Sequence, residues 1–255
     1  MDDVVTVSHL CKSYAVGATR STVLRDVSFS VRRGECLFLV GHSGSGKTTL
    51  LSILGCVLSA DSGDVEMLGE RVTEFSPAEQ ASFRRHRIGF VFQRYHLFEA
   101  LNALENVKVP LDLLGTEPAK ARRRALELLK RVDLADKARR RVTQLSMGQR
   151  QRVAIARALA ANPDIVLADE PTASLDKTAG WNALETLKTL CREEAKTAIV
   201  VTHDDRILPL ADRVLTLADG RLMESHGEDE PPAISPVKLK SPRRKSIADS
   251  EAGES

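Results

Sequence analysis

The sequence lacks most features that mark secreted, metal-binding or membrane-spanning proteins. It has four cysteines in 255 residues and no C-x-x-C pair, so we expect small buried thiols in a reducing compartment, without a cysteine metal site. No apolar run approaches the roughly 20 residues that span a bilayer, and the first residues lack the basic and apolar regions of a signal peptide. The formal net charge of +2 gives no strong attraction to nucleic acid. We therefore expect a cytoplasmic protein without a nucleic-acid partner.

The most informative segment is a glycine-rich stretch with the G-x-x-x-x-G-K-[ST] spacing of a phosphate-binding loop. It reads Gly41, His42, Ser43, Gly44, Ser45, Gly46, Lys47, Thr48 and continues into Thr49. The largely apolar segment 35–40 before it predicts a buried strand, and residues 49–54 after it predict a helix whose N-terminus attracts anions. We expect this segment, Thr49 included, to bind ATP. Lys47 would reach the β- and γ-phosphates and assist catalysis, and Thr48 would hold Mg²⁺.

Polar residues follow three further predicted strands, at the edge where ligands bind open parallel sheets. Asp169 ends an apolar run and suits a carboxylate that holds Mg²⁺. We expect the next residue, Glu170, to orient or deprotonate the attacking water, and His203 to contact the γ-phosphate. Gln93 would bind Mg²⁺ or water and so touch the nucleotide. A structural acidic pair before Pro171 and a packed histidine are the alternative interpretations.

A second predicted anion site opens with Ser146. Ser146 and Gln149 have the spacing of a capping box, and an apolar stripe at helical spacing follows them. The free N–H groups at that helix start would attract an anion, although a simple well-capped helix explains the same pattern. One nucleotide needs one phosphate loop, so a second such site suggests the nucleotide of another protomer.

Together these motifs resemble the ATP-binding-cassette (ABC) ATPase family over residues 4–225. The resemblance implies two cassettes that sandwich two ATP molecules, with the signature at Ser146, Gly148 and Gln149 facing the partner's γ-phosphate. It also implies that Asp176, in the segment after the acidic strand, lies at the nucleotide. Tyr14 falls where the family places an aromatic that stacks on adenine, and a strand-edge tyrosine is the alternative.

One residue departs from the family's usual Leu-Ser-Gly-Gly-Gln signature, because Met147 replaces its first glycine. At positive φ this residue would cost on the order of 1–2 kcal/mol. At negative φ, as in a first helical turn, its N–H would still be available to bind an anion. We expect an active cassette, since Ser146 and Gly148 are intact.

A narrower resemblance is to cassettes of the macrolide-exporter and lipoprotein-release class. It is carried by residues 73–76, 84–93 and 103–107 and by the signature, which is also similar to that of glycolipid-exporting cassettes. In this class, coupling helices of membrane subunits dock near the glutamine loop. Tyr95, Leu97, Phe98 and Leu101 would line that groove here, although packing inside the helical lobe explains them nearly as well. The class often has a proline near Glu99, which this chain lacks.

The predicted fold is an α/β P-loop NTPase of the ABC type. We expect a parallel core sheet, an N-terminal antiparallel β-subdomain, and an inserted helical subdomain at about residues 95–162, all within one domain of residues 1–225. Residues 226–255 are rich in Ser-Pro pairs and predict a disordered tail. A basic cluster that includes residues 243–245 gives the alternative of a regulatory or membrane-surface contact.

These features predict the ATP-hydrolysing subunit of a transporter. A second copy and a separate membrane permease would be its partners, and a periplasmic adaptor would connect through the permease. The class suggests an exporter or a lipid or lipoprotein-release system, with the cassette peripheral on the inner face of the cell membrane. A cell-division-type cassette that moves a membrane partner without cargo is the alternative.

Overall fold

The computed structural model describes residues 3–17 and 19–223, which form ten strands, six α-helices and four short 3-10 helices. The strands are β1 (Asp3–Val16), β2 (Thr19–Arg32), β3 (Cys36–Val40), β4 (Ser62–Met67), β5 (Glu70–Arg71), β6 (Ile88–Val91), β7 (Ile165–Asp169), β8 (Thr197–Thr202), β9 (Arg213–Ala218) and β10 (Arg221–Met223). The α-helices are α1 (Lys47–Leu54), α2 (Pro77–Arg87), α3 (Ala103–Leu113), α4 (Pro118–Arg131), α5 (Met147–Ala160) and α6 (Lys177–Glu193). The 3-10 helices are η1 (Val72–Glu74), η2 (Ala135–Lys137), η3 (Val142–Gln144) and η4 (Asp205–Leu210).

The strands make two sheets, as the sequence predicts. An antiparallel sheet has the order β2-β1-β4-β5, and the core sheet has the order β10-β9-β3-β8-β7-β6. All neighbours in the core sheet are parallel except the closing β9–β10 hairpin. The fold is therefore the predicted α/β architecture with its added antiparallel sheet.

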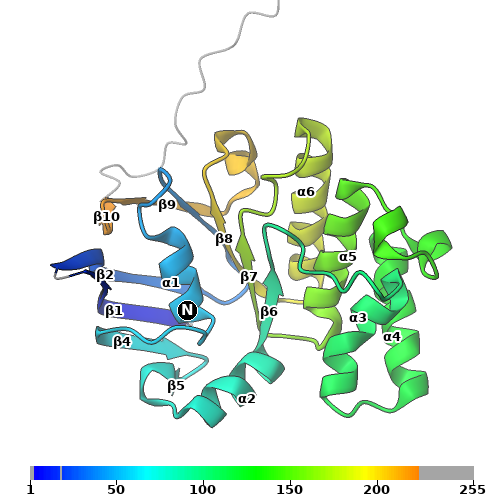
Figure 1. Cartoon of the computed structure of the whole chain (residues 1–255), viewed down its shortest axis with the longest axis horizontal. Coiled ribbons are helices and arrows are strands. Elements are labelled where there is room, and N and C mark those ends of the chain that lie inside the picture. The colour runs from blue at the N-terminus through cyan, green and yellow to red at the C-terminus, as the bar shows by residue number, and fades with distance from the viewer. Residues whose placement is uncertain (1–2, 18, 224–255) are drawn as a thin grey trace, which may run out of the picture. The chain divides into compact units, whose positions relative to one another are not determined.

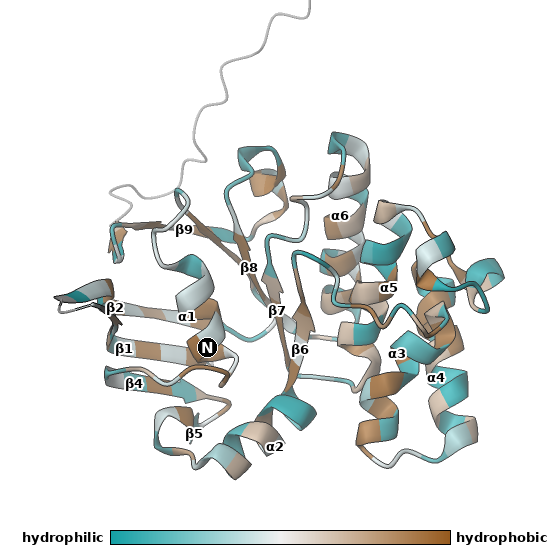
Figure 2. Ribbon diagram, in the orientation of Figure 1, coloured by the Kyte–Doolittle hydropathy of each residue, from teal (hydrophilic) through white to brown (hydrophobic). Residues whose placement is uncertain are grey.

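Alternate residues of the central strands feed two separate hydrophobic cores. In β3, Leu37 and Leu39 join a core made with α1 and the antiparallel sheet, while Phe38 between them joins a core made with helices α3 to α6. Both faces of these strands are thus buried, which explains their nearly continuous apolar sequences. Figure 2 shows β7, β8 and β9 as largely hydrophobic, whereas α5 and α6 also carry hydrophilic residues.

The structure adjusts several predicted element boundaries. Helix α1 begins at Lys47, inside the glycine-rich motif, and the first α-helix after β6 is α3, which begins at Ala103. Sequence analysis missed α2, although Ser76 and Glu79 form a capping box at its start. None of the helices in residues 3–17 and 19–223 combines the length and the apolar composition that a membrane span requires. The predicted tail at 226–255 lies outside those residues, and the domain boundaries stay a prediction.

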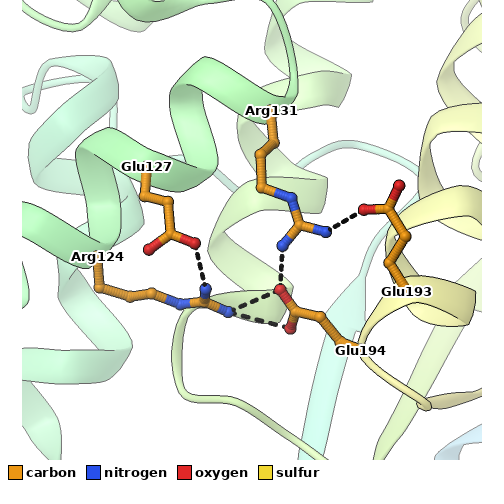
Figure 3. Close-up of polar contacts among 5 residues, drawn as sticks. All are labelled: Arg124, Glu127, Arg131, Glu193 and Glu194. Atoms are coloured by element: carbon orange, nitrogen blue, oxygen red, sulfur yellow. Dashed lines mark hydrogen bonds and ion pairs between the residues drawn. The ribbon is translucent and has the colours of Figure 1, made fainter.

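A network of arginines and glutamates joins α4 to the end of α6 (Figure 3). Arg124 donates to both carboxylate oxygens of Glu194 at 3.0 Å, and Arg131 contacts the same carboxylate. Arg131 also bonds Glu193 at 2.6 Å, and Arg124 bonds Glu127 at 3.1 Å. The Glu194 side chain is only 15% exposed, so water does little to screen its two ion pairs. Glu194 therefore holds the helical insertion against the end of α6.

We predict that Glu194→Ala lowers the free energy of unfolding by about 1–3 kcal/mol, because it leaves two partly buried guanidinium groups without their shared acceptor. Glu127→Ala is the matched control, since Glu127 is 54% exposed and, among the described residues, pairs with Arg124 alone. Its cost should stay below about 0.5 kcal/mol. Urea unfolding measures both values, and equal losses would contradict the role given to Glu194.

Candidate active site

The predicted catalytic segments meet because three neighbouring parallel strands end at one edge of the core sheet. Val40 of β3 pairs with Thr202 of β8, and Asp169 of β7 pairs with Val201 of the same strand. The phosphate loop directly follows Val40, Glu170 follows Asp169, and His203 follows Thr202. Figure 1 shows β7 and β8 side by side in this arrangement. The edge is the one at which open parallel sheets bind ligands.

The phosphate loop leaves the N-terminus of α1 free to face an anion. Gly46 precedes α1 at a φ of +106°, and a side chain there would place Cβ 2.8 Å from both the Val23 carbonyl oxygen and a Leu24 methyl carbon. Among the described residues, none caps α1 through a side chain, and its first turn carries no acidic residue. The first N–H groups of α1 therefore have no built-in anion.

Lys47 lies across the inside of the loop. Its Nζ donates to the carbonyl oxygens of Gly41 at 2.7 Å and His42 at 2.9 Å, and the residue is only 5% exposed. Burial lowers the pKa of Lys47, while the charges of Glu170 and Asp169 act in the opposite direction. An ammonium has three donors, so one remains for a phosphate oxygen.

Ser45 adds an unpaired polar atom to the wall of the phosphate loop. Its buried hydroxyl has no hydrogen-bond partner within the described part of the chain. A buried polar group without a partner is costly, so its place in this loop is consistent with a phosphate ligand.

Thr48 and Asp169 bring two oxygen ligands together, because the Thr48 hydroxyl donates to Asp169 Oδ1 at 3.2 Å. Burial raises the pKa of Asp169, and the Thr48 hydrogen bond and Lys47 oppose that change. No cluster of three His, Cys, Asp or Glu residues that could hold a metal occurs in residues 3–17 and 19–223. A hydroxyl and one carboxylate suit Mg²⁺ only with phosphate and water oxygens, which is how Mg²⁺ commonly binds at nucleotide sites. The pair therefore fits the predicted ion.

Glu170 and His203 form a close pair at the ends of β7 and β8. His203 Nδ1 lies 2.7 Å from Glu170 Oε1, and the His203 backbone N–H donates to Oε2 at 3.3 Å. Glu170 has a φ of +45°, which costs about 1–2 kcal/mol for a residue with a side chain, and its N–H bonds the Val201 carbonyl. Strain of this kind concentrates at functional positions.

Gln93 is not brought into contact with the Mg²⁺ candidates. It is exposed and makes no hydrogen bond to any described residue. Its backbone forms the second residue of a turn in which the Tyr95 N–H donates to the Phe92 carbonyl at 3.0 Å. The structure thus presents Gln93 on an ordered turn, two residues beyond β6.

The signature residues and Asp176 line one cavity of about 410 Å³. Ser146 caps α5 and forms the predicted capping box with Gln149. Asp176 caps α6 by accepting from the Ala179 N–H at 2.9 Å, so part of its acceptor capacity is used inside the chain. Met147 is not among the residues with positive φ; it begins α5 and is 57% exposed. The helical alternative for Met147 is therefore the observed one, without backbone strain.

The adenine-side prediction rests on Tyr14 alone. Tyr14 is 40% exposed on β1, and Lys12 Nζ lies 5.7 Å from its ring centroid. Sequence analysis missed a contact across the phosphate loop, where His42 Nε2 lies 3.5 Å from Asp219. No local pattern could have revealed it, because the two residues are far apart in the chain.

Comparison with known proteins agrees with this geometry. A family profile described as "ABC transporter" matches residues 24–173. The chain is 41% identical over 222 residues to the macrolide export ATP-binding/permease protein MacB of Bartonella quintana, covering 87% of this chain and 34% of that protein. It is 42% identical to the protein of the same name from Bradyrhizobium diazoefficiens, covering 93% and 36%. The chain thus spans about a third of the length of these relatives.

Solved structures give the same family. The dimeric cassette MJ0796, in a post-hydrolysis state bound to ADP and Pi, matches with a TM-score of 0.80 and 40% identity over 86% of this chain and 97% of that chain. CbiO1 of Clostridium perfringens, part of the transporter complex cbiONQ, matches with a TM-score of 0.80 and 28% identity, covering 88% of each chain. The chain therefore belongs to the ABC transporter family and is an ATP-hydrolysing cassette of that family.

Proposed function

We propose that two copies of this cassette close around two ATP molecules and that hydrolysis reopens them. The observation that carries the proposal is the paired Glu170 and His203 beside Lys47, together with a second capped helix start at Ser146. The cavity lined by Ser146 includes no residue of the phosphate loop, which supports a contact between Ser146 and the nucleotide bound by the other copy. The related cassette MJ0796 is dimeric.

Each residue has a distinct part in this reaction. Lys47 and the first N–H groups of α1 bind the phosphates, and the Thr48–Asp169 pair would hold Mg²⁺, which neutralises charge on the phosphate oxygens when bound. Glu170 orients the attacking water and accepts its proton. Its oxygens keep acceptor capacity while His203 fixes their direction.

Further residues complete the proposed nucleotide site. Tyr14 stacks on the adenine base of the nucleotide held by its own chain. Gln93 contacts the metal or water at the edge of the phosphates. Gly148, Gln149 and Asp176 contact the nucleotide of the other copy.

The cassette would power a membrane permease of an export or lipid or lipoprotein-release system, at the inner face of the cell membrane. Support comes from the MacB relatives, whose names combine an ATP-binding part with a permease. The exposed ring of Phe98, which is 52% exposed, gives the docking groove an apolar contact point. A periplasmic adaptor would act through that permease.

We predict that Glu170→Gln lowers kcat for ATP hydrolysis by about 10²- to 10⁴-fold, because the water loses its base. ATP should then trap a dimer that light scattering after gel filtration detects. Glu185→Gln is the control, because it removes the same charge from the exposed face of α6. It should keep a normal kcat and should not accumulate as a dimer during steady-state turnover. A Glu170→Gln protein that stays monomeric in saturating Mg-ATP would contradict the sandwich.

Met147 provides a test of the signature. Because its backbone is helical, its N–H faces the same way with or without a side chain, and we predict that Met147→Ala and Met147→Gly change kcat by less than about twofold. Steady-state ATPase rates measure this. A several-fold rise in kcat in both variants would show that the Met147 side chain restrains closure of the dimer. A rise in kcat in Met147→Gly alone would show that the backbone at this position restrains it.

The membrane partner can be tested at the docking groove. Tagged cassette solubilised from membranes of its source cells should retain an equimolar integral membrane protein, and Phe98→Glu should lose it while keeping basal ATPase activity. Leu113→Glu is the matched control, because Leu113 is 66% exposed but lies at the end of α3 outside the groove. Equal retention by both variants would remove Phe98 from the interface, and recovery of no membrane protein by the unaltered chain would contradict the transport proposal.

A further inference from the structure

A buried arginine stands in an otherwise apolar part of α5. Arg157 is 8% exposed and lies among buried residues of the helix such as Ala156 and Leu159. Burial lowers the pKa of its guanidinium, and within residues 3–17 and 19–223 it forms no ion pair with a carboxylate. An apolar side chain would fill such a place at lower cost in free energy, so the charge calls for a reason other than packing.

Among the described residues, the hydrogen-bond acceptors of Arg157 are backbone carbonyls of the segment after Gln93. Arg157 donates to the Tyr95 carbonyl at 2.7 Å and to the His96 carbonyl. Both acceptor residues are left-handed, with φ of +59° and +45°, although neither is glycine. Two consecutive residues in this conformation oppose folding, so the contact exists at a conformational cost as well as a solvation cost.

The Tyr95 carbonyl belongs to the turn that presents Gln93, and His96 directly follows that turn. The Tyr95 N–H closes the turn by donating to the Phe92 carbonyl. The Phe92 ring stacks on the Phe90 ring with a centroid separation of 5.2 Å, and its centroid lies 4.7 Å from that of the His96 ring. The aromatic stack fixes the β6 side of the turn, and Arg157 fixes its other side. Gln93 itself stays exposed between the two anchors.

The other end of the same helix carries the signature. Arg157 lies roughly three turns after Ser146 along α5. Ala158, the residue after Arg157, packs closely against Gly89 of β6. A Cβ on Gly89 would lie only 2.3 Å from the Ala158 carbonyl oxygen. The Tyr95 side chain lies near Arg150 of α5 and near Ser174, which precedes Asp176. The Gln93 turn is therefore bound to α5 and borders the segment that ends at Asp176.

We propose that Arg157 is a positioning residue that makes the Gln93 turn and the signature helix move as one body, so that Gln93 meets the nucleotide only when Ser146 is correctly placed. The proposal rests on the functions proposed above for Gln93 and Ser146. Arg157 would thus affect ATP hydrolysis without touching the nucleotide or the metal.

The test compares Arg157→Met with Arg157→Lys in the full chain. Loss of the two hydrogen bonds in Arg157→Met should lower kcat by about tenfold or more, since small displacements at reacting groups are costly. Affinity for a fluorescent ATP analogue should stay within about twofold, because the phosphate loop and Tyr14 are untouched. Arg157→Lys, which can still donate to a carbonyl, should recover part of the rate. Arg123→Met, on the exposed face of α4, should keep normal activity.

A double-mutant cycle with Gln93→Ala shows whether Arg157 acts through the turn. Gln93→Ala should lower kcat by itself, and adding either Arg157 substitution should lower it little further. If Arg157→Met does not fold, the cycle is measured with Arg157→Lys. Equal losses of kcat in both backgrounds, or a lower melting temperature with unchanged kcat, would overturn the proposal and leave the function of Gln93 intact. A Gln93→Ala protein with normal kcat would instead overturn the proposed function of Gln93, and the positioning by Arg157 with it.

Discussion

The parallel register of β3, β8 and β7 is the constraint on which the rest of the site depends. Because Val40 pairs with Thr202 and Asp169 with Val201, three segments from distant parts of the sequence emerge together. Both faces of these strands are buried in separate cores, so a one-residue shift in register would send each side chain into the core shaped for its neighbour and disrupt the packing on both sides. Hydrophobic packing thus fixes the positions of the polar groups that carry the chemistry.

Several groups at this edge are held against their intrinsic preferences. Burial lowers the pKa of Lys47 and raises that of Asp169, and Glu170 occupies a left-handed conformation. Farther along the same edge, Tyr95 and His96 are left-handed as well and bind a buried arginine. A core packed for stability alone would avoid each of these costs. They are consistent with a site whose groups are set in place before the nucleotide arrives.

The sequence predicted the fold well where local chemistry is strong. The glycine-rich loop, the capping box at Ser146 and the apolar strands each carry a signal within a few residues, and the structure has them at the expected positions. The same reasoning identified candidate residues by type and order, and their functions stay predictions. The absent glycine at Met147 could be interpreted only after the helical start of α5 was observed.

Contacts between residues far apart in the chain could not be predicted from the sequence. The bond between Arg157 and two backbone carbonyls joins α5 to a loop, and no side-chain pattern marks a carbonyl acceptor. One signal was available, since an arginine inside the apolar run of α5 is unusual for a packed face. The start of helix α2 also had a visible capping box that was overlooked. The pair of His42 and Asp219 had no local signal at all.

The central claim is that one chain grips the triphosphate and the signature of a second copy completes the site. A crystal structure of the Glu170→Gln chain with Mg²⁺ and ATP tests it most directly. The expected result is a dimer with the terminal phosphate within hydrogen-bond distance of Lys47 in one copy and of Ser146 in the other. A nucleotide bound away from residues 41–48, or a Ser146 that faces no phosphate in any dimer, would contradict it.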